Sequence, residues 1–221
     1  MTSRDNPPRR MPEWSLSDRR NDPRQLEPAD QPEADRAARF RRQADAQDYL
    51  HSRWLMRELA MRRLPDDGVI ELESFDDARP GLKGHPEMGI SWSRSGPLAC
   101  AALFPNGMVG IDIEQIADRD TAAILGMVAL PQEAELINAI DENVAHLWAF
   151  YRLWTAKEAI LKCRGEGLRG GAKSVEIPAE YLIGDADNLV VHERVGDLCL
   201  MRLDAGLEAC CSIAFSVQKQ I

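Results

Sequence analysis

A carboxylate and an ammonium group stand one helical turn apart in a stretch of the chain that is otherwise largely apolar. Residues 150–162 have helical periodicity, and Glu158 falls on the apolar side of the predicted helix. That side is formed by Leu147, Tyr151, Trp154 and Leu161. A carboxylate is rarely buried among such residues unless it is paired or holds a metal ion. Lys162 follows one turn later, so an acid and a base are predicted on one helix face. The alternative is that Glu158 and Lys162 form an exposed ion pair that stabilises the helix by about 0.3–0.5 kcal/mol.

A second acidic feature is the segment Gly110-Ile-Asp-Ile-Glu114. On a strand, residues i and i+2 face the same way, so Asp112 and Glu114 are predicted on one side and Ile111 and Ile113 on the other, in a core. Two neighbouring carboxylates repel each other unless a cation lies between them. Oxygen ligands of this kind suit Mg²⁺, which also takes water and phosphate oxygens. Taken alone, the pair is more typical of an alternating strand with a solvated acidic face.

The elements that carry these residues follow from the apolar pattern and the turn signals. An amphipathic helix is predicted over 33–64, broken near Asp45, with arginines along its other face. That face is either solvated or an anion-binding surface. Strands are predicted over 69–74, 89–93, 98–104 and 108–114, and the short turns between the last three predict an antiparallel meander. Helices follow over 119–128, 131–140 and 142–164, and then strands over 175–177, 189–195, 198–203 and 209–217.

Composition sets the general class. The chain has 221 residues, a net charge of −9 and five cysteines without metal-ligand spacing. The charge argues against a nucleic-acid or acidic-membrane binder, and the cysteines indicate reduced thiols in a cytoplasmic protein. No apolar run is long enough to span a bilayer. The proline- and arginine-rich residues 1–32 predict a disordered tail, with docking of Trp14–Leu16 as a short arm as the alternative. We expect an N-terminal half over 33–108 and a C-terminal half over 109–221, both α+β, packed side by side.

The two acidic motifs and their spacing resemble the 4′-phosphopantetheinyl transferases. The pattern is Gly110-Ile-Asp-x-Glu, then Trp154-x-x-Lys157-Glu158-x-x-x-Lys162. It is most similar to the larger, surfactin-synthetase-type branch, whose single chain is a pseudo-dimer of two α+β halves. Four further segments are similar to family motifs: 52–59, with Arg53; 83–86, with Lys83; 91–93; and 165–168. The chain departs from the family at His85, which replaces a lysine, and at Trp92, which replaces a histidine of a Ser-His-Ser motif that begins at Ser91.

The resemblance implies an enzyme that transfers phosphopantetheine from coenzyme A to a serine of an apo acyl or peptidyl carrier protein and releases 3′,5′-ADP. It implies Mg²⁺ held by Asp112, Glu114 and Glu158. Glu158, a base at neutral pH with an ordinary pKa, takes the serine proton, and Lys162 stabilises the leaving phosphate. The residues expected to contact coenzyme A are Arg53, Lys83, His85, Ser91, Trp92, Lys157 and Lys162. We expect a monomer that binds neither nucleic acid nor membrane. The departures at His85 and Trp92 motivate an alternative, a non-catalytic protein of the same fold that binds coenzyme A or a carrier.

Overall fold

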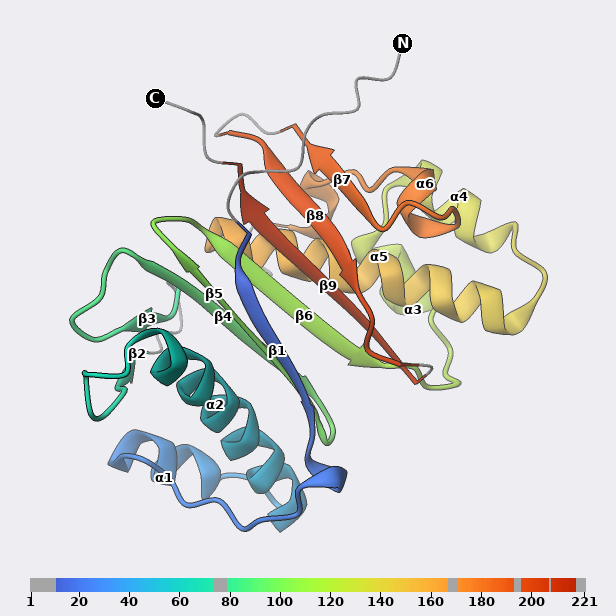
Figure 1. The fold of residues 1–221 in the computed structure, drawn as a ribbon. Helices are drawn as coiled ribbons and strands as arrows, with labels where there is room; N and C mark the ends of the chain where they lie inside the picture. The colour runs from blue at the N-terminus through green and yellow to red at the C-terminus, as the bar shows by residue number, and fades with distance from the viewer. Residues whose placement is uncertain (1–10, 74–78, 167–170, 193–195, 207, 218–221) are drawn as a thin grey trace.

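The protein consists of two halves, and in each half helices cover one face of a β-sheet (Figure 1). The two sheets pack against each other through their other faces. The computed structural model describes residues 11–73, 79–166, 171–192, 196–206 and 208–217. In the N-terminal half, the antiparallel sheet order is β1–β5–β4. Its strands are β1 (Glu13–Asp18), β4 (Met88–Ser95) and β5 (Leu98–Pro105). The helix α2 (Gln43–Arg63) covers this sheet, burying Leu55, Met56 and Leu59 against β4 and β5. Shorter elements complete the half: η1 (Arg19–Asn21), α1 (Gln31–Ala37), β2 (Leu72–Glu73) and β3 (Gly81–Leu82).

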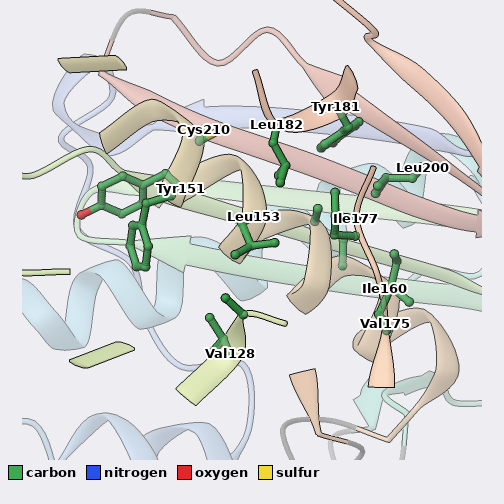
Figure 2. Packing of buried hydrophobic residues seen from close by; sticks show 14 of the residues in the cluster. Val128, Tyr151, Leu153, Ile160, Val175, Ile177, Tyr181, Leu182, Leu200 and Cys210 are labelled. Carbon is green, nitrogen blue, oxygen red and sulfur yellow. The ribbon is translucent and has the colours of Figure 1, made fainter. Parts of the chain in front are cut away.

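The C-terminal half is built around the long helix α5 (Asn143–Arg164). Its antiparallel sheet has the order β6–β9–β8–β7. The strands are β6 (Val109–Gln115), β7 (Asn188–Val191), β8 (Leu198–Leu203) and β9 (Ala209–Ser216). The helices α3 (Ala122–Val128), α4 (Pro131–Asn138) and α6 (Ala179–Leu182) and the turn η3 (Ala172–Ser174) pack around α5. Figure 2 shows the apolar side chains that α5 shares with β8, β9 and the 175–177 segment.

The two sheets meet in a central apolar cluster. Alternate residues of β5 divide between two cores: Ala99, Ala101 and Leu103 face α2, whereas Cys100, Ala102 and Phe104 face the other sheet. Ile111, Ile113 and Ile213 enter the same central cluster from β6 and β9. This alternation is what the period of two in a strand predicts. The α+β fold predicted from the sequence is confirmed.

The predicted meander is wrong in its third strand. β4 and β5 form the expected hairpin, but β6 pairs with β9 and not with β5. After β5 the chain turns at Asn106, which has a left-handed φ of 58°, and passes from the first sheet to the second. The predicted strand at 175–177 is also wrong, since that segment lies outside any strand. Its polar backbone atoms are bound by side chains instead: Val175 O accepts from Lys157 and Ile177 N donates to Glu133.

The prediction of a disordered tail is wrong for residues 11–32. β1 pairs with β5 over its whole length, with Trp14 opposite Ala102 and Leu16 opposite Cys100. Further on, the backbone of Leu26 exchanges two hydrogen bonds with the side chain of Gln47. The alternative of a docked arm is therefore correct, because the edge of β5 supplies hydrogen-bond partners that composition does not reveal. Residues 1–10 lie outside the described part. The helix predicted over 33–64 is interrupted between α1 and α2, a few residues before Asp45.

Two further observations bear on the class of protein. No helix within the described ranges is both long and apolar enough to cross a membrane. All five cysteines are buried as free thiols.

Candidate active site

Both ends of α5 are fixed by capping interactions, and this helps to set the positions of Glu158 and Lys162. The Glu142 carboxylate accepts hydrogen bonds from the N–H groups of Val144 and Ala145 and so caps the N-terminus. Gly165 ends the helix with a left-handed φ of 74°, a conformation in which a side chain would be strained. Between these caps the apolar face is buried, and Glu158 and Lys162 lie half-buried near the C-terminal end.

β6 lies directly against α5 at Gly110. A Cβ atom there would stand 2.0 Å from Ala159 O and 2.4 Å from Cys163 N. Only glycine permits this approach of strand backbone to helix backbone. The contact brings the next outward-facing residue of β6, Asp112, within reach of Lys162. Asp112 and Glu114 lie on the face away from the central cluster, as the period of two predicts.

Asp112 and Lys162 form a half-buried ion pair that includes a serine of β4. Lys162 Nζ lies 2.6 Å from Asp112 Oδ1 and 2.9 Å from Ser93 Oγ, and Ser93 Oγ donates to the same carboxylate oxygen at 2.7 Å. Burial lowers the pKa of Lys162, but the Asp112 carboxylate outweighs burial and the net shift is upward. The second oxygen, Asp112 Oδ2, is buried and has no hydrogen-bond partner within the described residues. That oxygen is available to a ligand.

Glu114 is held from two sides. Ser95 Oγ donates to its Oε2 at 2.7 Å, and Trp154 Nε1 donates to its Oε1 at 3.2 Å. Burial and the neighbouring Asp112 raise the pKa of Glu114 despite these hydrogen bonds. Trp154 therefore orients a carboxylate in addition to packing on the core.

The carboxylate of Glu158 accepts no hydrogen bond from any part of the chain that the structure describes. Burial raises its pKa to about 7; Lys162 opposes this shift, and Asp112 and Glu114 add to it. The expectation of an ordinary pKa is therefore wrong, because the helix presents this acid to a half-buried space beside two other acids. A carboxyl that titrates near neutrality matches the demand on a general base.

The three acids fit a divalent cation in charge and in ligand type, although they do not yet form a closed set. Within the described residues, no three acidic, histidine or cysteine side chains converge into a complete metal group. Lys162 instead supplies the positive charge at Asp112 Oδ1. Burial, and after it the repulsion between the acids, raises the pKa values of Glu114 and Glu158. A hard cation would relieve that repulsion and could bind the free Oδ2 of Asp112. The metal set of Asp112, Glu114 and Glu158 stays a prediction.

The residues expected to bind coenzyme A are not gathered in one place. The Arg53 guanidinium is enclosed by the chain itself: its Nε lies 2.5 Å from Glu33 Oε1, and the group stacks over Tyr49 and Trp92. Glu33 also pairs with Arg57. Burial opposes ionisation of Glu33, but hydrogen bonds from the two arginines outweigh it and lower the pKa of Glu33. Arg53 therefore already has an acidic partner within the chain.

The loop that carries Lys83 and His85 is exposed. Lys83 pairs with Glu71 at 2.7 Å, and His85 pairs with Asp67 and Glu87. The hydrogen bond to Asp67 is the main cause of the raised pKa of His85. His85 borders a cavity of about 660 Å³ between the 79–90 segment and the 106–109 turn. Asp112, Glu114 and Glu158 do not line that cavity.

Ser91 and Trp92 point to opposite sides of β4. The Ser91 hydroxyl accepts from Ile111 N at 3.1 Å and so ties the two sheets together. Trp92 packs on the α2 side, under the Arg53 guanidinium. Neither contact is with the three acids.

Lys157 is not placed to contact a phosphate, and that prediction is wrong. Its side chain is 1% exposed, and Nζ binds Glu133 Oε2 at 2.6 Å and three backbone carbonyls. An ammonium group has three hydrogens, so these acceptors saturate it. A step of one residue along a helix turns the side chain by about 100°, which takes Lys157 into the core while Glu158 faces the site.

Sequence reasoning gave no role to Ser93 and Ser95, which bind the two carboxylates of β6. Their signal is the alternation Ser91-x-Ser93-x-Ser95, because a period of two on a strand puts three hydroxyls on one face. Glu33 and Glu133 were also missed. Each is an acid in a helical segment whose partner is remote in sequence, and no local pattern marks it.

Comparison with known proteins agrees with this geometry. Residues 108–183 match the family model of the 4′-phosphopantetheinyl transferase superfamily. The chain is 30% identical over 140 residues to the 4′-phosphopantetheinyl transferase psf-1 of Bacillus pumilus, covering 62% of this chain and 58% of that protein. It is 35% identical over 97 residues to the 4′-phosphopantetheinyl transferase AcpT of Salmonella typhi, covering 43% of this chain and 50% of that protein. It is 33% identical over 181 residues to the L-aminoadipate-semialdehyde dehydrogenase-phosphopantetheinyl transferase of Eremothecium gossypii, covering 77% and 60%. The chain thus spans between half and three fifths of the length of these relatives.

Proposed function

We propose that this chain transfers the 4′-phosphopantetheine group of coenzyme A to a serine of an apo acyl or peptidyl carrier protein, because residues 108–183 match the family model of the 4′-phosphopantetheinyl transferase superfamily. The matched residues include Asp112, Glu114, Glu158 and Lys162. The single observation that carries the proposal is the convergence of a half-buried carboxyl of pKa about 7 with two carboxylates and a paired lysine.

The reaction balances without an oxidant or reductant. The serine oxygen of the carrier forms a bond to the phosphorus on the pantetheine side of the pyrophosphate. The bond from that phosphorus to the bridging oxygen breaks, and its electron pair leaves with 3′,5′-ADP. The serine proton goes to the enzyme.

Glu158 is the proposed acceptor of that proton. Its carboxylate accepts no hydrogen bond within the described residues, so its lone pairs are free to receive the serine hydroxyl. With a pKa of about 7, it is substantially ionised at neutral pH and close to the value that is most effective in general base catalysis.

Lys162 is the proposed partner of the leaving phosphate. Its ammonium is held by Asp112 and Ser93, and its raised pKa keeps it charged. A fixed positive charge in a half-buried site stabilises the negative charge that develops on the departing oxygen. Asp112 and Ser93 set the position of that charge.

Mg²⁺ is the proposed metal, and Asp112, Glu114 and Glu158 are the residues that would hold it. When bound, it would supply Lewis-acid neutralisation of pyrophosphate charge. Ser95 and Trp154 fix Glu114 for that role, and Ser93 fixes Asp112. We propose in addition that the protein acts in the cytoplasm as a monomer.

The test is conversion of a panel of apo carrier proteins by the intact protein with coenzyme A and Mg²⁺, followed by mass spectrometry of the carrier. We expect holo carrier from the wild type and a loss of rate on the order of 100-fold or more in Glu158→Gln, because a positioned general base contributes about 10²–10⁴-fold. Glu135→Gln, which removes an exposed carboxylate from α4, is the matched control and should retain the rate. Near-normal rates in both Glu158→Ala and Asp112→Ala would refute the site assignment.

One observation favours a second candidate, a non-catalytic protein that binds coenzyme A or a carrier. Arg53, Lys83 and His85 each pair with an acid of the chain, so these basic residues expected to bind phosphates already have internal partners. Release of 3′,5′-ADP in the presence of an apo carrier distinguishes the two. Binding of coenzyme A without any release would support the second candidate.

A further inference from the structure

We propose that the buried ion pair between Lys157 and Glu133 is a positioning device that fixes the rotation of α5 and thereby the place of Glu158. The inference rests on the proposed function for its catalytic consequence and on the contacts of the pair for the rest. Neither residue touches Asp112, Glu114 or Lys162 through any hydrogen bond of the structure.

Lys157 joins α5 to two segments that are distant in sequence. Its Nζ donates to Val128 O at 3.0 Å at the end of α3, and to Ala172 O at 3.1 Å and Val175 O at 2.9 Å in and after η3. These carbonyls belong to no strand and are not paired within a regular helix. A buried carbonyl without a partner is unfavourable, and the ammonium group of Lys157 provides a donor for all three carbonyls.

Glu133 extends this junction on the other side. Its Oε2 accepts from Lys157 at 2.6 Å and from Leu130 N at 2.7 Å, and its Oε1 accepts from Ile177 N at 2.7 Å. The contact with Leu130 closes the first turn of α4, where Pro131 already starts the helix. The ion pair therefore ties α3, α4, η3 and the 175–177 segment to one residue of α5.

The surroundings explain why this junction is rigid. Lys157 and Glu133 side chains are 1% and 2% exposed. Val128, Val175 and Ile177 close around α5 next to Leu153 and Ile160 (Figure 2). Two opposite charges in such a place must stay together, because moving one away leaves the other buried and unpaired. The helix cannot rotate or slide without breaking the pair.

Glu158 is the next residue on the same turn of α5, so any rotation that frees Lys157 moves the Glu158 carboxylate as well. The opposite side of this turn is held by the contact of Ala159 O with Gly110 of β6. The carboxylate is thus placed between two fixed points. A displacement of about 1 Å of a catalytic group is enough to lower a rate on the order of 100-fold.

The experiment compares Lys157→Met, Glu133→Gln, the double variant and Lys173→Met as a control that removes an exposed lysine of η3. Steady-state rates are measured with an apo carrier, varying coenzyme A. We expect Lys157→Met to lower kcat on the order of 100-fold with a change in KM for coenzyme A of less than about threefold. The double variant should recover a part of kcat, because it no longer buries an unpaired charge. Lys173→Met should match the wild type.

Two outcomes would overturn the proposal. One is a rise in KM for coenzyme A with kcat preserved in Lys157→Met, which is the result expected of a phosphate contact. The other is a double variant no better than Lys157→Met. If Lys157→Met does not fold, Glu133→Gln carries the test with the same expected fall in kcat, since it keeps the side-chain volume while it removes the charge and replaces one acceptor oxygen by an NH2 donor.

Amide hydrogen exchange supplies a measurement that does not depend on activity. In Lys157→Met the N–H groups of Leu130 and Ile177 should exchange at least about tenfold faster, with β8 and β9 unaffected. Unchanged exchange at both positions would refute the junction itself. A wild type that modifies no carrier, together with accelerated exchange in the variant, would refute the proposed function and leave the junction standing.

Discussion

Glu158 should make the protein less stable while making it active. Its pKa of about 7 in the folded protein lies above the ordinary value of 4.5. The folded state therefore holds the proton more tightly than the unfolded state. It follows that the contribution of Glu158 to stability is most favourable at low pH and is lost as pH rises from about 4.5 to about 7.

The size of the effect follows from the shift. A change from 4.5 to about 7 corresponds to roughly 3.4 kcal/mol at 1.36 kcal/mol for each pH unit. Glu158 is only half-buried, so solvent screening reduces this to about 1–3 kcal/mol. We expect Glu158→Gln to raise the free energy of unfolding by that amount at about pH 8, and most of the gain to vanish at about pH 5.

The assay is urea unfolding of the wild type and Glu158→Gln with a chelator, repeated at several pH values. Glu135→Gln, on the exposed side of α4, is the control for removal of one charge. Addition of Mg²⁺ should stabilise the wild type more than the variant, because a ligand of the native state raises its stability. The reasoning would be refuted if Glu158→Gln were less stable than the wild type at about pH 8. It would also be refuted if the difference in free energy of unfolding between the two proteins were the same at about pH 8 and about pH 5.

Three other predictions concern the frame of the site. Lys162→Met should leave Asp112 with only the hydrogen bond from Ser93. Measured by holo-carrier formation, it should lower kcat more than it raises KM for coenzyme A, and an effect on KM alone would contradict the proposed placement of Lys162. Gly110→Ala should lower the free energy of unfolding by about 1–3 kcal/mol, because the new Cβ would clash with the backbone of α5. Gly126→Ala is the control, since a Cβ at that position meets no atom within 4 Å. Equal urea midpoints for Gly110→Ala and the wild type would count against the close approach of β6 to α5. Glu33→Gln should lower the free energy of unfolding by about 3 kcal/mol at neutral pH, because it leaves Arg53 and Arg57 without their shared acid. Folding lowers the pKa of Glu33, so in urea unfolding the contribution of Glu33 should disappear as the pH falls below about 4.5.

The placement of the acids on β6 and α5 could be predicted because its signals are local. The apolar period and Gly165 define α5, and the period of two in β6 separates Asp112 and Glu114 from Ile111 and Ile113. Both depend on residues within a few positions of each other. The structure adds the distances and the raised pKa of Glu158, which depend on how strand and helix pack at Gly110.

The internal ion pairs of the residues expected to bind coenzyme A could not be predicted because their partners are remote. Arg53 is paired with Glu33, 20 positions earlier, and Lys157 with Glu133, 24 positions earlier. A basic side chain near a phosphate motif looks the same in sequence whether it faces solvent, a ligand or a buried acid. Tertiary packing alone decides which of these occurs, and in both cases an acid of the chain is the partner.

The N-terminal strand β1 has a consequence for the behaviour of the protein in solution. β5 is apolar along its whole length, and β1 pairs with the edge that β4 leaves free. A chain shortened to residue 33, at the end of the apparent tail, would expose that edge with its backbone N–H and C=O groups unpaired. Such an edge pairs readily with the same edge of another molecule and leads to aggregation. We therefore expect removal of residues 11–32 to promote self-association.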